Sequence, residues 1–194
     1  MIKPKILLMF SGGLDSTGVF WKLIQKNEPL LVHHLYLSNK ENRTKAEEIA
    51  VKNIVDYMKK IKNFSYSESY HEYPSHNGNF MWDSDIYNFV AGTICISVRS
   101  IKEVAIGRTK SDAGFEQRAE RGTKILNLLA PNVNKIYPVE DMTKKEVYKM
   151  LPENLRELTW SCRTPVYKEN NIEICKRCKT CLEILQINRE LNGI

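Results

Sequence analysis

A glycine turn between two apolar segments constrains this chain more than any other stretch. The turn is Ser11-Gly12-Gly13-Leu14-Asp15-Ser16-Thr17, and apolar runs precede it at 6–10 and follow it at 19–24. Adjacent glycines allow backbone conformations closed to other residues, and the first N–H groups of a following helix then face a ligand. Because such turns bind phosphate, the pattern predicts a strand, a phosphate-binding loop and a helix.

The loop is not the mononucleotide pattern G-x-x-x-x-G-K-[ST], because no Lys-Ser/Thr follows the glycines. We expect the hydroxyls of Ser11, Ser16 and Thr17 to contact phosphate instead. Asp15 would repel a nucleotide unless a divalent cation lay between them, so the loop predicts Mg²⁺. The alternative interpretation is a plain strand-to-helix turn with hydroxyl caps.

Ser11 to Ser16 resemble, without a gap, the SGGxDS signature of the ATP pyrophosphatase (PP-loop) superfamily. Its members cleave ATP between the α and β phosphates and adenylate a substrate oxygen. The resemblance implies catalytic roles for Asp15 and Ser16, and an ATP-binding segment. We assign that segment to Phe10, Ser11, Gly12, Gly13, Leu14, Asp15, Ser16 and Thr17, with Gly107 from a later loop.

Length and composition predict one domain with an appendage. The chain has 194 residues, of which 42% are hydrophobic and 27% charged, as in soluble globular proteins. No apolar run approaches the ~18 residues of a membrane span, and no signal-peptide profile opens the chain, so we expect a cytoplasmic protein without membrane contact. A net charge of +6 suits phosphate ligands but does not by itself imply nucleic acid.

Strand and helix patterns alternate along the chain. Further strands are expected at 30–37, 64–70, 103–107 and 134–138, with 64–70 near a sheet edge. Helices are expected at 44–61 and 143–150, each opened by a Thr-x-x-Glu capping box (Thr44 with Glu47, Thr143 with Glu146), and at 86–99 and 115–129. This alternation predicts an α/β fold with an open, mostly parallel five-stranded sheet flanked by helices, and ligands at the carboxyl ends of its strands.

Two polar features have ordinary structural interpretations. His33 and His34 are adjacent in a strand and point to opposite faces, so we do not expect them to share a metal. The segment 71–85 is a long polar loop. Its aromatic residues, with His76, either line a substrate pocket or pack back on the domain.

Four of the five cysteines lie near the C-terminus: Cys162, Cys175, Cys178 and Cys181. Thiolates at this spacing predict a closed, structural Zn²⁺ site, with an iron–sulfur cluster or disulfides as the alternatives. Basic residues flank the cysteines and either bind nucleic acid or offset the charge of the thiolates, the account we favour. We therefore divide the chain into an ATP-binding part, 1–158, and a zinc knot with a final helix, 159–194, within one fold. Leu182, Leu185 and Leu191 of that helix are expected to dock on the main domain.

The loop and the cysteine knot together resemble the 7-cyano-7-deazaguanine synthase family. The weaker matching pieces are Gly107, Asp112, Pro138, Lys144-x-Glu146 and Pro165, whereas 38–43 and 82–85 depart from the family pattern on the substrate side. The resemblance implies a ligase that uses ATP and ammonia to convert a carboxylate, 7-carboxy-7-deazaguanine, into a nitrile. Lys110, Arg108 and Arg43 are candidates to neutralise pyrophosphate, and the substrate-binding candidates are Arg108, Asp112 and Arg163.

Two other functions compete with this one. A PP-loop tRNA-thiolating enzyme would need a sulfur-relay cysteine or catalytic cluster and a broad basic surface, yet the only cysteine outside the knot is Cys95, in an apolar helix stripe. A non-catalytic, zinc-bearing nucleotide-binding module would not need Asp15 and every loop hydroxyl. We expect no nucleic-acid partner, and the sequence leaves the oligomeric state open, a homodimer included.

Overall fold

The computed structural model describes residues 3–73, 82–112 and 115–193. Its centre is a five-stranded sheet in the order β3-β2-β1-β4-β5, and all neighbouring strands are parallel. The strands are β1 (Ile6–Phe10), β2 (Leu30–Ser38), β3 (Ser65–Glu72), β4 (Glu103–Ala105) and β5 (Asn134–Ile136). The predicted open parallel sheet is confirmed, and so is the edge position of the third strand.

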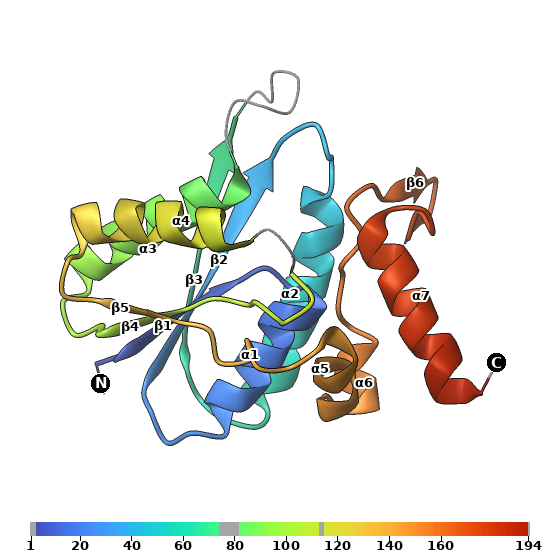
Figure 1. Cartoon of the computed structure of the whole chain (residues 1–194), viewed down its shortest axis with the longest axis horizontal. Helices are drawn as coiled ribbons and strands as arrows, with labels where there is room; N and C mark the ends of the chain where they lie inside the picture. Colours follow the sequence, from blue (N-terminus) through green and yellow to red (C-terminus); the bar gives the residue numbers. More distant parts are fainter. Residues whose placement is uncertain (1–2, 74–81, 113–114, 194) are drawn as a thin grey trace.

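Helices cover both faces of this sheet (Figure 1). One face carries α1 (Leu14–Ile24), α2 (Thr44–Lys59), α5 (Lys144–Met150) and α6 (Glu153–Arg156), and the other carries α3 (Asp83–Ser97) and α4 (Phe115–Leu129). No helix among the described residues is long and apolar enough to cross a bilayer.

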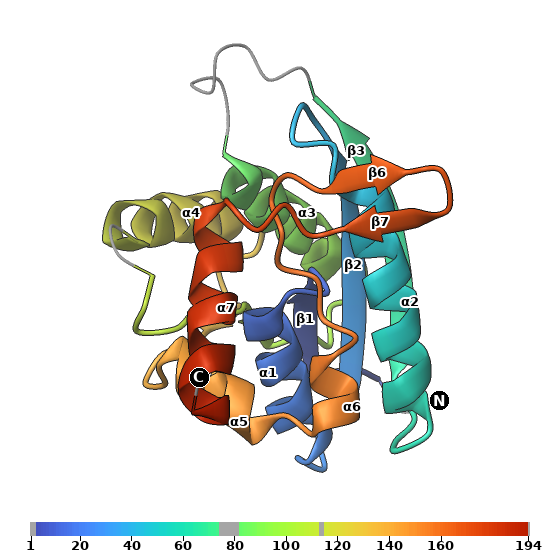
Figure 2. The same cartoon turned by 90° about the vertical axis from the view of Figure 1, so that its right-hand side faces the viewer.

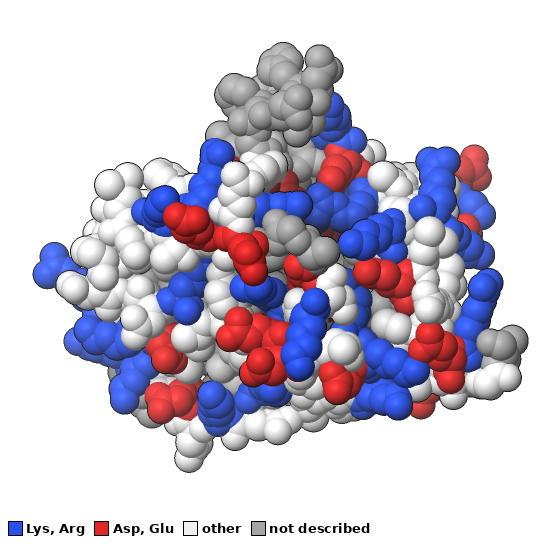
Figure 3. Space-filling model, in the orientation of Figure 1, with Lys and Arg blue, Asp and Glu red and all other residues white. Residues whose placement is uncertain are grey.

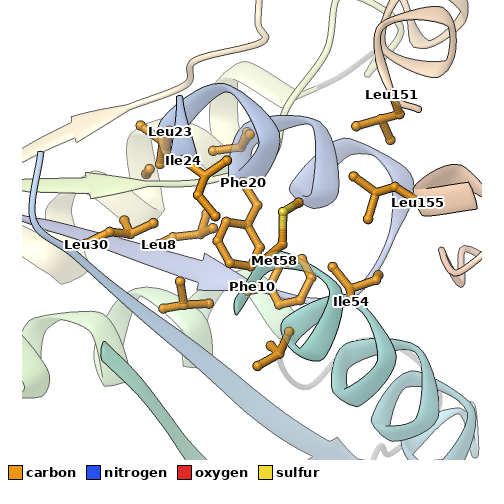
Figure 4. Close-up of a cluster of buried hydrophobic side chains, with 14 of the residues drawn as sticks. Leu8, Phe10, Phe20, Leu23, Ile24, Leu30, Ile54, Met58, Leu151 and Leu155 are labelled. Atoms are coloured by element: carbon orange, nitrogen blue, oxygen red, sulfur yellow. The ribbon is translucent and has the colours of Figure 1, made fainter. Parts of the chain in front are cut away.

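The core follows the two-residue period of the central strand β1. Leu8 and Phe10 point into the cluster with α1 and α2, where the ring centroids of Phe10 and Phe20 lie 5.2 Å apart (Figure 4). Leu7 and Met9 point into the opposite cluster, against α3 and α4. Every residue of β1 is buried, which explains its continuous apolar sequence. Because β1 is buried along its whole length, the loop that follows it starts from a rigidly held strand.

The two histidines of β2 have separate hydrogen-bond partners. His33 shares hydrogen bonds of 2.9 Å with Ser67 and Ser69 of the neighbouring strand. His34 bonds through Nδ1 to the carbonyl oxygen of Phe10 at 2.8 Å. They contribute to the sheet, as expected, and do not converge on one ligand.

Only one of the two predicted capping boxes forms. Thr143 and Glu146 bond reciprocally at the start of α5, which confirms that prediction. The prediction for Thr44 and Glu47 is wrong: Thr44 donates to the carbonyl oxygen of Leu37, and buried Glu47 accepts from Arg43 at 2.7 Å. Glu47 faces the interior, where a guanidinium outcompetes the backbone N–H as its partner.

The C-terminal segment lies beside α1, α5 and α6 (Figure 2). It contains an antiparallel hairpin that the sequence analysis missed, β6 (Val166–Lys168) with β7 (Asn171–Glu173), and then helix α7 (Lys179–Asn192). The inward stripe of α7 is Cys181, Ile184 and Ile187. Leu182 is 53% exposed, so its predicted docking is wrong. Because Cys181 turns inward to the other cysteines, the next residue of the helix faces outward.

Candidate active site and metal centre

The loop between β1 and α1 depends on two glycines at positions of close approach. Gly12 has a φ of +75°, which favours glycine, and a Cβ there would lie 2.8 Å from a methyl carbon of Val51. A Cβ on Gly107, after β4, would lie 2.7 Å from the backbone nitrogen of Ser16. The end of β4 therefore lies against the first turn of α1, so Gly107 and the glycine loop meet, as their assignment to one binding segment predicted.

The loop hydroxyls divide into two groups. Ser11 Oγ and Ser16 Oγ lie 2.9 Å apart, and both serines line a cavity of about 300 Å³. Thr17 is fully buried and donates to the carbonyl oxygen of Gly13 at 2.9 Å, so this hydroxyl holds the helix turn. Phe10 is also fully buried, in the core. Ser16 Oγ also donates to the carbonyl oxygen of Gly13, at 3.0 Å, but Ser16 lines the cavity and Thr17 does not. Ser11 and Ser16 are thus the hydroxyls placed to meet a ligand.

One carboxylate oxygen of Asp15, in the glycine loop, has no hydrogen-bond partner among the described residues. Its Oδ2 lies 3.6 Å from Nζ of Lys144, while Oδ1 is buried and has no hydrogen-bond partner in the described chain. Burial raises the pKa of Asp15 to about 6, although the positive charge of Lys144 opposes the shift. An unpartnered carboxylate oxygen beside a glycine loop of the kind that binds phosphate is a suitable ligand for a hard cation such as Mg²⁺.

Lys144 is a site residue that the sequence analysis had quoted only as part of a matching motif. It lies at the start of α5, lines the cavity and bonds Glu183 of α7 at 3.0 Å. The Thr143 cap fixes this first turn, so the cap indirectly positions the ammonium group next to Asp15.

The cavity collects segments that are far apart in sequence. The predicted residues that line it are Ser11, Gly13, Leu14, Asp15, Ser16, Arg43, Gly107, Cys162 and Arg163. Residues that the sequence analysis did not assign to the site also line it, among them Glu47, Asp83, Asn88, Arg118, Lys135 and Lys144. Because they come from different helices and strands with no common motif, only the folded chain brings them together.

Three predicted polar residues lie away from the cavity lining. Lys110 is exposed, and its backbone N–H bonds Met142. The guanidinium of Arg108 lies 5.4 Å from the ring centroid of Tyr137. Asp112 accepts from the backbone N–H of Thr109 at 2.9 Å. The loop after β4 therefore lines the cavity through Gly107 and not through these three side chains, although the negative charge of Asp112 helps to raise the pKa values of Asp15 and Lys144.

A buried ionic cluster forms another part of the cavity wall. Arg43 contacts Glu41 at 2.8 Å, Glu47 at 2.7 Å and also Asp83. Burial raises the pKa of Glu47 to about 7. Arg163 bonds Glu41 at 2.5 Å, which ties the cysteine segment to the loop before α2. The charges of Arg43 and Arg163 are therefore already balanced by carboxylates.

The four cysteines form a compact sulfur cluster. The Sγ atoms of Cys162, Cys175, Cys178 and Cys181 all lie within 4.8 Å of one another, and those of Cys175 and Cys181 are 3.9 Å apart. Tetrahedral Zn–S bonds of about 2.3 Å place sulfurs about 3.8 Å apart. The backbone N–H of Cys178 donates to Cys175 Sγ at 3.3 Å, as suits a thiolate. This donor set fits one tetrahedral metal ion.

Hydrogen bonds connect the cysteine cluster to the glycine loop after β1. The N–H of Trp160 donates to the carbonyl oxygen of Gly12 at 2.9 Å, and the N–H of Leu14 donates to Ser161 Oγ at 3.2 Å. Thr180, between two of the cysteines, donates to the carbonyl oxygen of Ser161 at 2.6 Å. The cluster therefore supports the loop through residues 160–161.

The strand order, the glycine loop after β1 and the cavity at the strand ends define a PP-loop type of α/β fold. No family model matches the chain, and no curated protein matches its sequence.

Solved structures share this fold. The U34-tRNA thiolase NcsA from Methanococcus maripaludis, solved with its 4Fe-4S cluster, is similar at a TM-score of 0.56 and 18% identity. The match covers 97% of this chain and 66% of that one, so the chain spans just under two thirds of its length. NMN synthetase from Francisella tularensis matches at a TM-score of 0.50 and 10% identity, over 98% of this chain and 78% of that one. At these identities the likeness establishes the fold.

Proposed function

We propose that this chain is an ATP-dependent enzyme that cleaves ATP between the α and β phosphates and adenylates a small-molecule carboxylate. The observation that carries the proposal is the unpartnered Oδ1 of Asp15 next to the glycine loop, at the edge of a cavity. The loop N–H groups with the Ser11 and Ser16 hydroxyls would hold the phosphates, and Asp15 would hold Mg²⁺, which offsets phosphate charge when bound.

Lys144 takes the role in pyrophosphate departure that the sequence assigned to Lys110, Arg108 or Arg43. Its ammonium group already lies beside Asp15 and lines the cavity, whereas Lys110 and Arg108 do not line it. Arg43 lines the cavity, but its charge is balanced by Glu41, Glu47 and Asp83. A fixed cation where negative charge accumulates lowers the barrier without reorganisation of solvent.

The proposed acceptor is 7-carboxy-7-deazaguanine. Its carboxylate oxygen attacks the α phosphate of ATP and pyrophosphate leaves; ammonia then displaces AMP to give the amide. A second ATP then adenylates the amide oxygen. AMP departs with that oxygen, both N–H protons are lost, and the nitrile remains. The protein supplies no nucleophile in this scheme, only position and charge.

We propose that the cysteine cluster holds one structural Zn²⁺. The support is the sulfur spacing, which fits a single ion; a four-iron cluster would place a cube of iron and sulfide between the sulfurs and hold them farther apart. Four thiolates also leave no open coordination position.

Modification of tRNA is the second candidate function. The cysteine cluster adjoins the cavity through Cys162, and the similar NcsA structure is that of a tRNA thiolase with a cluster. Two observations favour the small molecule: Cys95 is buried away from the cavity lining, and the face in Figure 3 mixes acidic with basic side chains.

The deciding experiment offers the protein ATP, Mg²⁺ and ammonia with either 7-carboxy-7-deazaguanine or unmodified tRNA. We expect pyrophosphate and AMP only with the carboxylate, and mass spectrometry should show the amide and then the nitrile. Release of phosphate as the only product would contradict the PP-loop chemistry. Pyrophosphate release that requires tRNA and not the carboxylate would select the second candidate.

A further inference from the structure

A polar corner of the cavity, formed by α3, α4 and β5, has no part in the ATP chemistry described above. Its residues are Ser84 and Asn88 from α3, Arg118 from α4 and Lys135 from β5, and all four line the cavity. We call these four residues the α3–β5 corner.

The corner contains buried polar atoms without partners. Asn88 is 2% exposed; its Nδ2 donates to the carbonyl oxygen of Ser84 at 2.6 Å, but its Oδ1 has no partner among the described residues. Ser84 Oγ is likewise buried and unpartnered there. Native proteins rarely leave such atoms unsatisfied, so each is placed to bond a ligand or a water.

Two cations of the α3–β5 corner have no ion pair in the described chain. Of the five Lys and Arg residues that line the cavity, Arg43, Lys144 and Arg163 have carboxylate partners, whereas Lys135 and Arg118 have none. They contact aromatic rings instead: Lys135 lies 5.7 Å from the Tyr137 centroid and Arg118 lies 5.4 Å from that of Trp82. Burial lowers the pKa of Lys135 to about 8. An anion placed here would meet uncompensated positive charge.

Gly122 of α4 brings the amide and the ammonium group together. A Cβ built on Gly122 would lie 2.5 Å from Nδ2 of Asn88 and 2.9 Å from Nζ of Lys135, so both groups rest against this glycine. Asn88 and Lys135 are therefore neighbours, and one small ligand group can reach both.

We propose that the α3–β5 corner binds the carboxylate of the acceptor together with a ring N–H of the same molecule. Lys135, Arg118 and the Ser84 hydroxyl donate to the anion, and Asn88 Oδ1 accepts the N–H. A nucleotide phosphate shares the negative charge, but it has no N–H group beside it to satisfy Asn88. The proposal rests on the proposed function in one respect, that the acceptor is a carboxylate.

Protection of Lys135 from acetylation tests the site directly. The full chain is treated with an amine-acetylating reagent at pH 8, and Lys135 is followed by peptide mass spectrometry, with exposed Lys124 of α4 as the internal control. The probes are 7-carboxy-7-deazaguanine, pyrrole-3-carboxylate, furan-3-carboxylate, which lacks the N–H, and Mg²⁺ with α,β-methylene ATP.

We expect the first two probes to slow acetylation of Lys135 and not of Lys124, and furan-3-carboxylate to protect less by about fivefold or more in concentration. Protection by the nucleotide alone would assign the corner to phosphate and overturn the proposal. Absence of protection by every probe would also overturn it. Pyrophosphate release on addition of the carboxylate is scored separately, so failure of the proposed function remains distinguishable.

Two variants complete the test. Asn88→Asp keeps the side-chain size but adds a negative charge, and it should weaken binding of the carboxylate about tenfold or more while affinity for α,β-methylene ATP changes less than about twofold. Lys124→Met, which removes one exposed charge from α4, should leave both affinities unchanged. Equal losses for both ligands in Asn88→Asp would show that the residue only supports the fold.

Discussion

At Asp15 one carboxylate oxygen lies 3.6 Å from Lys144 Nζ and the other is buried without a partner in the described chain. Burial raises the pKa of this group to about 6, above the 3.8 of an exposed aspartate. The folded protein therefore takes up this proton more readily than the unfolded chain, and stability falls as the pH rises from about 4 to 6. Near neutral pH the ionised carboxylate destabilises the ligand-free fold.

Asp15→Asn should therefore separate stability from activity. We expect ATP turnover to fall more than tenfold, a barrier increase above about 1.4 kcal/mol, because an amide cannot anchor Mg²⁺. The melting temperature at pH 8 should rise, since the cost of burying a charged carboxylate is gone and Lys144 keeps its bond to Glu183.

The measurements are pyrophosphate release and a thermal melt, with exposed Asp56→Asn as the control for loss of one carboxylate. Turnover above a tenth of wild type would exclude Asp15 as the metal anchor.

At the scale of helices and strands, one sequence motif has two outcomes. Thr143-x-x-Glu146 forms a capping box on an exposed helix start, whereas Thr44-x-x-Glu47 does not, because Glu47 faces buried Arg43. The local pattern predicts the start of each helix correctly, but the partner of the glutamate depends on the surface against which the helix packs.

Thr143→Ala should destabilise the protein by about 1 kcal/mol, since the first turn of α5 loses its side-chain cap. For a domain of this size the melting temperature should fall by roughly 2–4 °C. Thr123→Ala is the matched control: Thr123 is inside α4 and bonds the carbonyl oxygen of Ala119, and alanine is the better helix former there. Equal effects of the two changes would rule out the cap.

The pairing of β2 with β3 predicts an acid-sensitive stability. Burial lowers the pKa of His33 from 6.5 to about 4, so the unfolded chain binds this proton first as the pH falls. Stability should be fully present above pH 6.5 and decline between about pH 6.5 and 4.

His33→Gln should flatten that decline in melts taken from pH 7 to 4.5, because the variant has no such proton to bind. An unchanged pH dependence would show that other groups cause the acid sensitivity. His71 of β3, which is exposed, provides the control as His71→Gln.

At the scale of the molecule, the cysteine segment completes the site. Residues 160–161 bond the glycine loop, Arg163 bonds Glu41, and Lys144 bonds Glu183 of α7. Residues 160–163 and α7 are therefore bonded to the elements that form the cavity, and loss of the cluster should affect the cavity as well as the tail.

Cys178→Ser should lower zinc content from one ion per chain and reduce the melting temperature, because a closed thiolate site contributes on the order of 10 kcal/mol to folding in comparable small domains. Affinity for Mg²⁺ with α,β-methylene ATP should also fall, through the contacts of residues 160–161. Elemental analysis, melts and titration calorimetry measure these effects. Cys95→Ala should leave zinc content unchanged. A metal-free or iron-bearing wild type would contradict the zinc assignment.

The sequence by itself determined the five strands of the parallel sheet, the main helices, the glycine loop and the set of four cysteines, but not the β6–β7 hairpin or the short helix α6. Each of these depends on short-range chemistry: two-residue and 3.6-residue apolar periods, glycine conformations and thiolate spacing. Tertiary structure alone decided which polar side chains share the cavity. Lys144, Asn88 and Lys135 come from separate elements and meet only where the strands end, whereas Lys110 and Arg108, closer in sequence to a loop glycine, have other contacts. Side-chain proximity across elements depends on packing, and no local pattern encodes it.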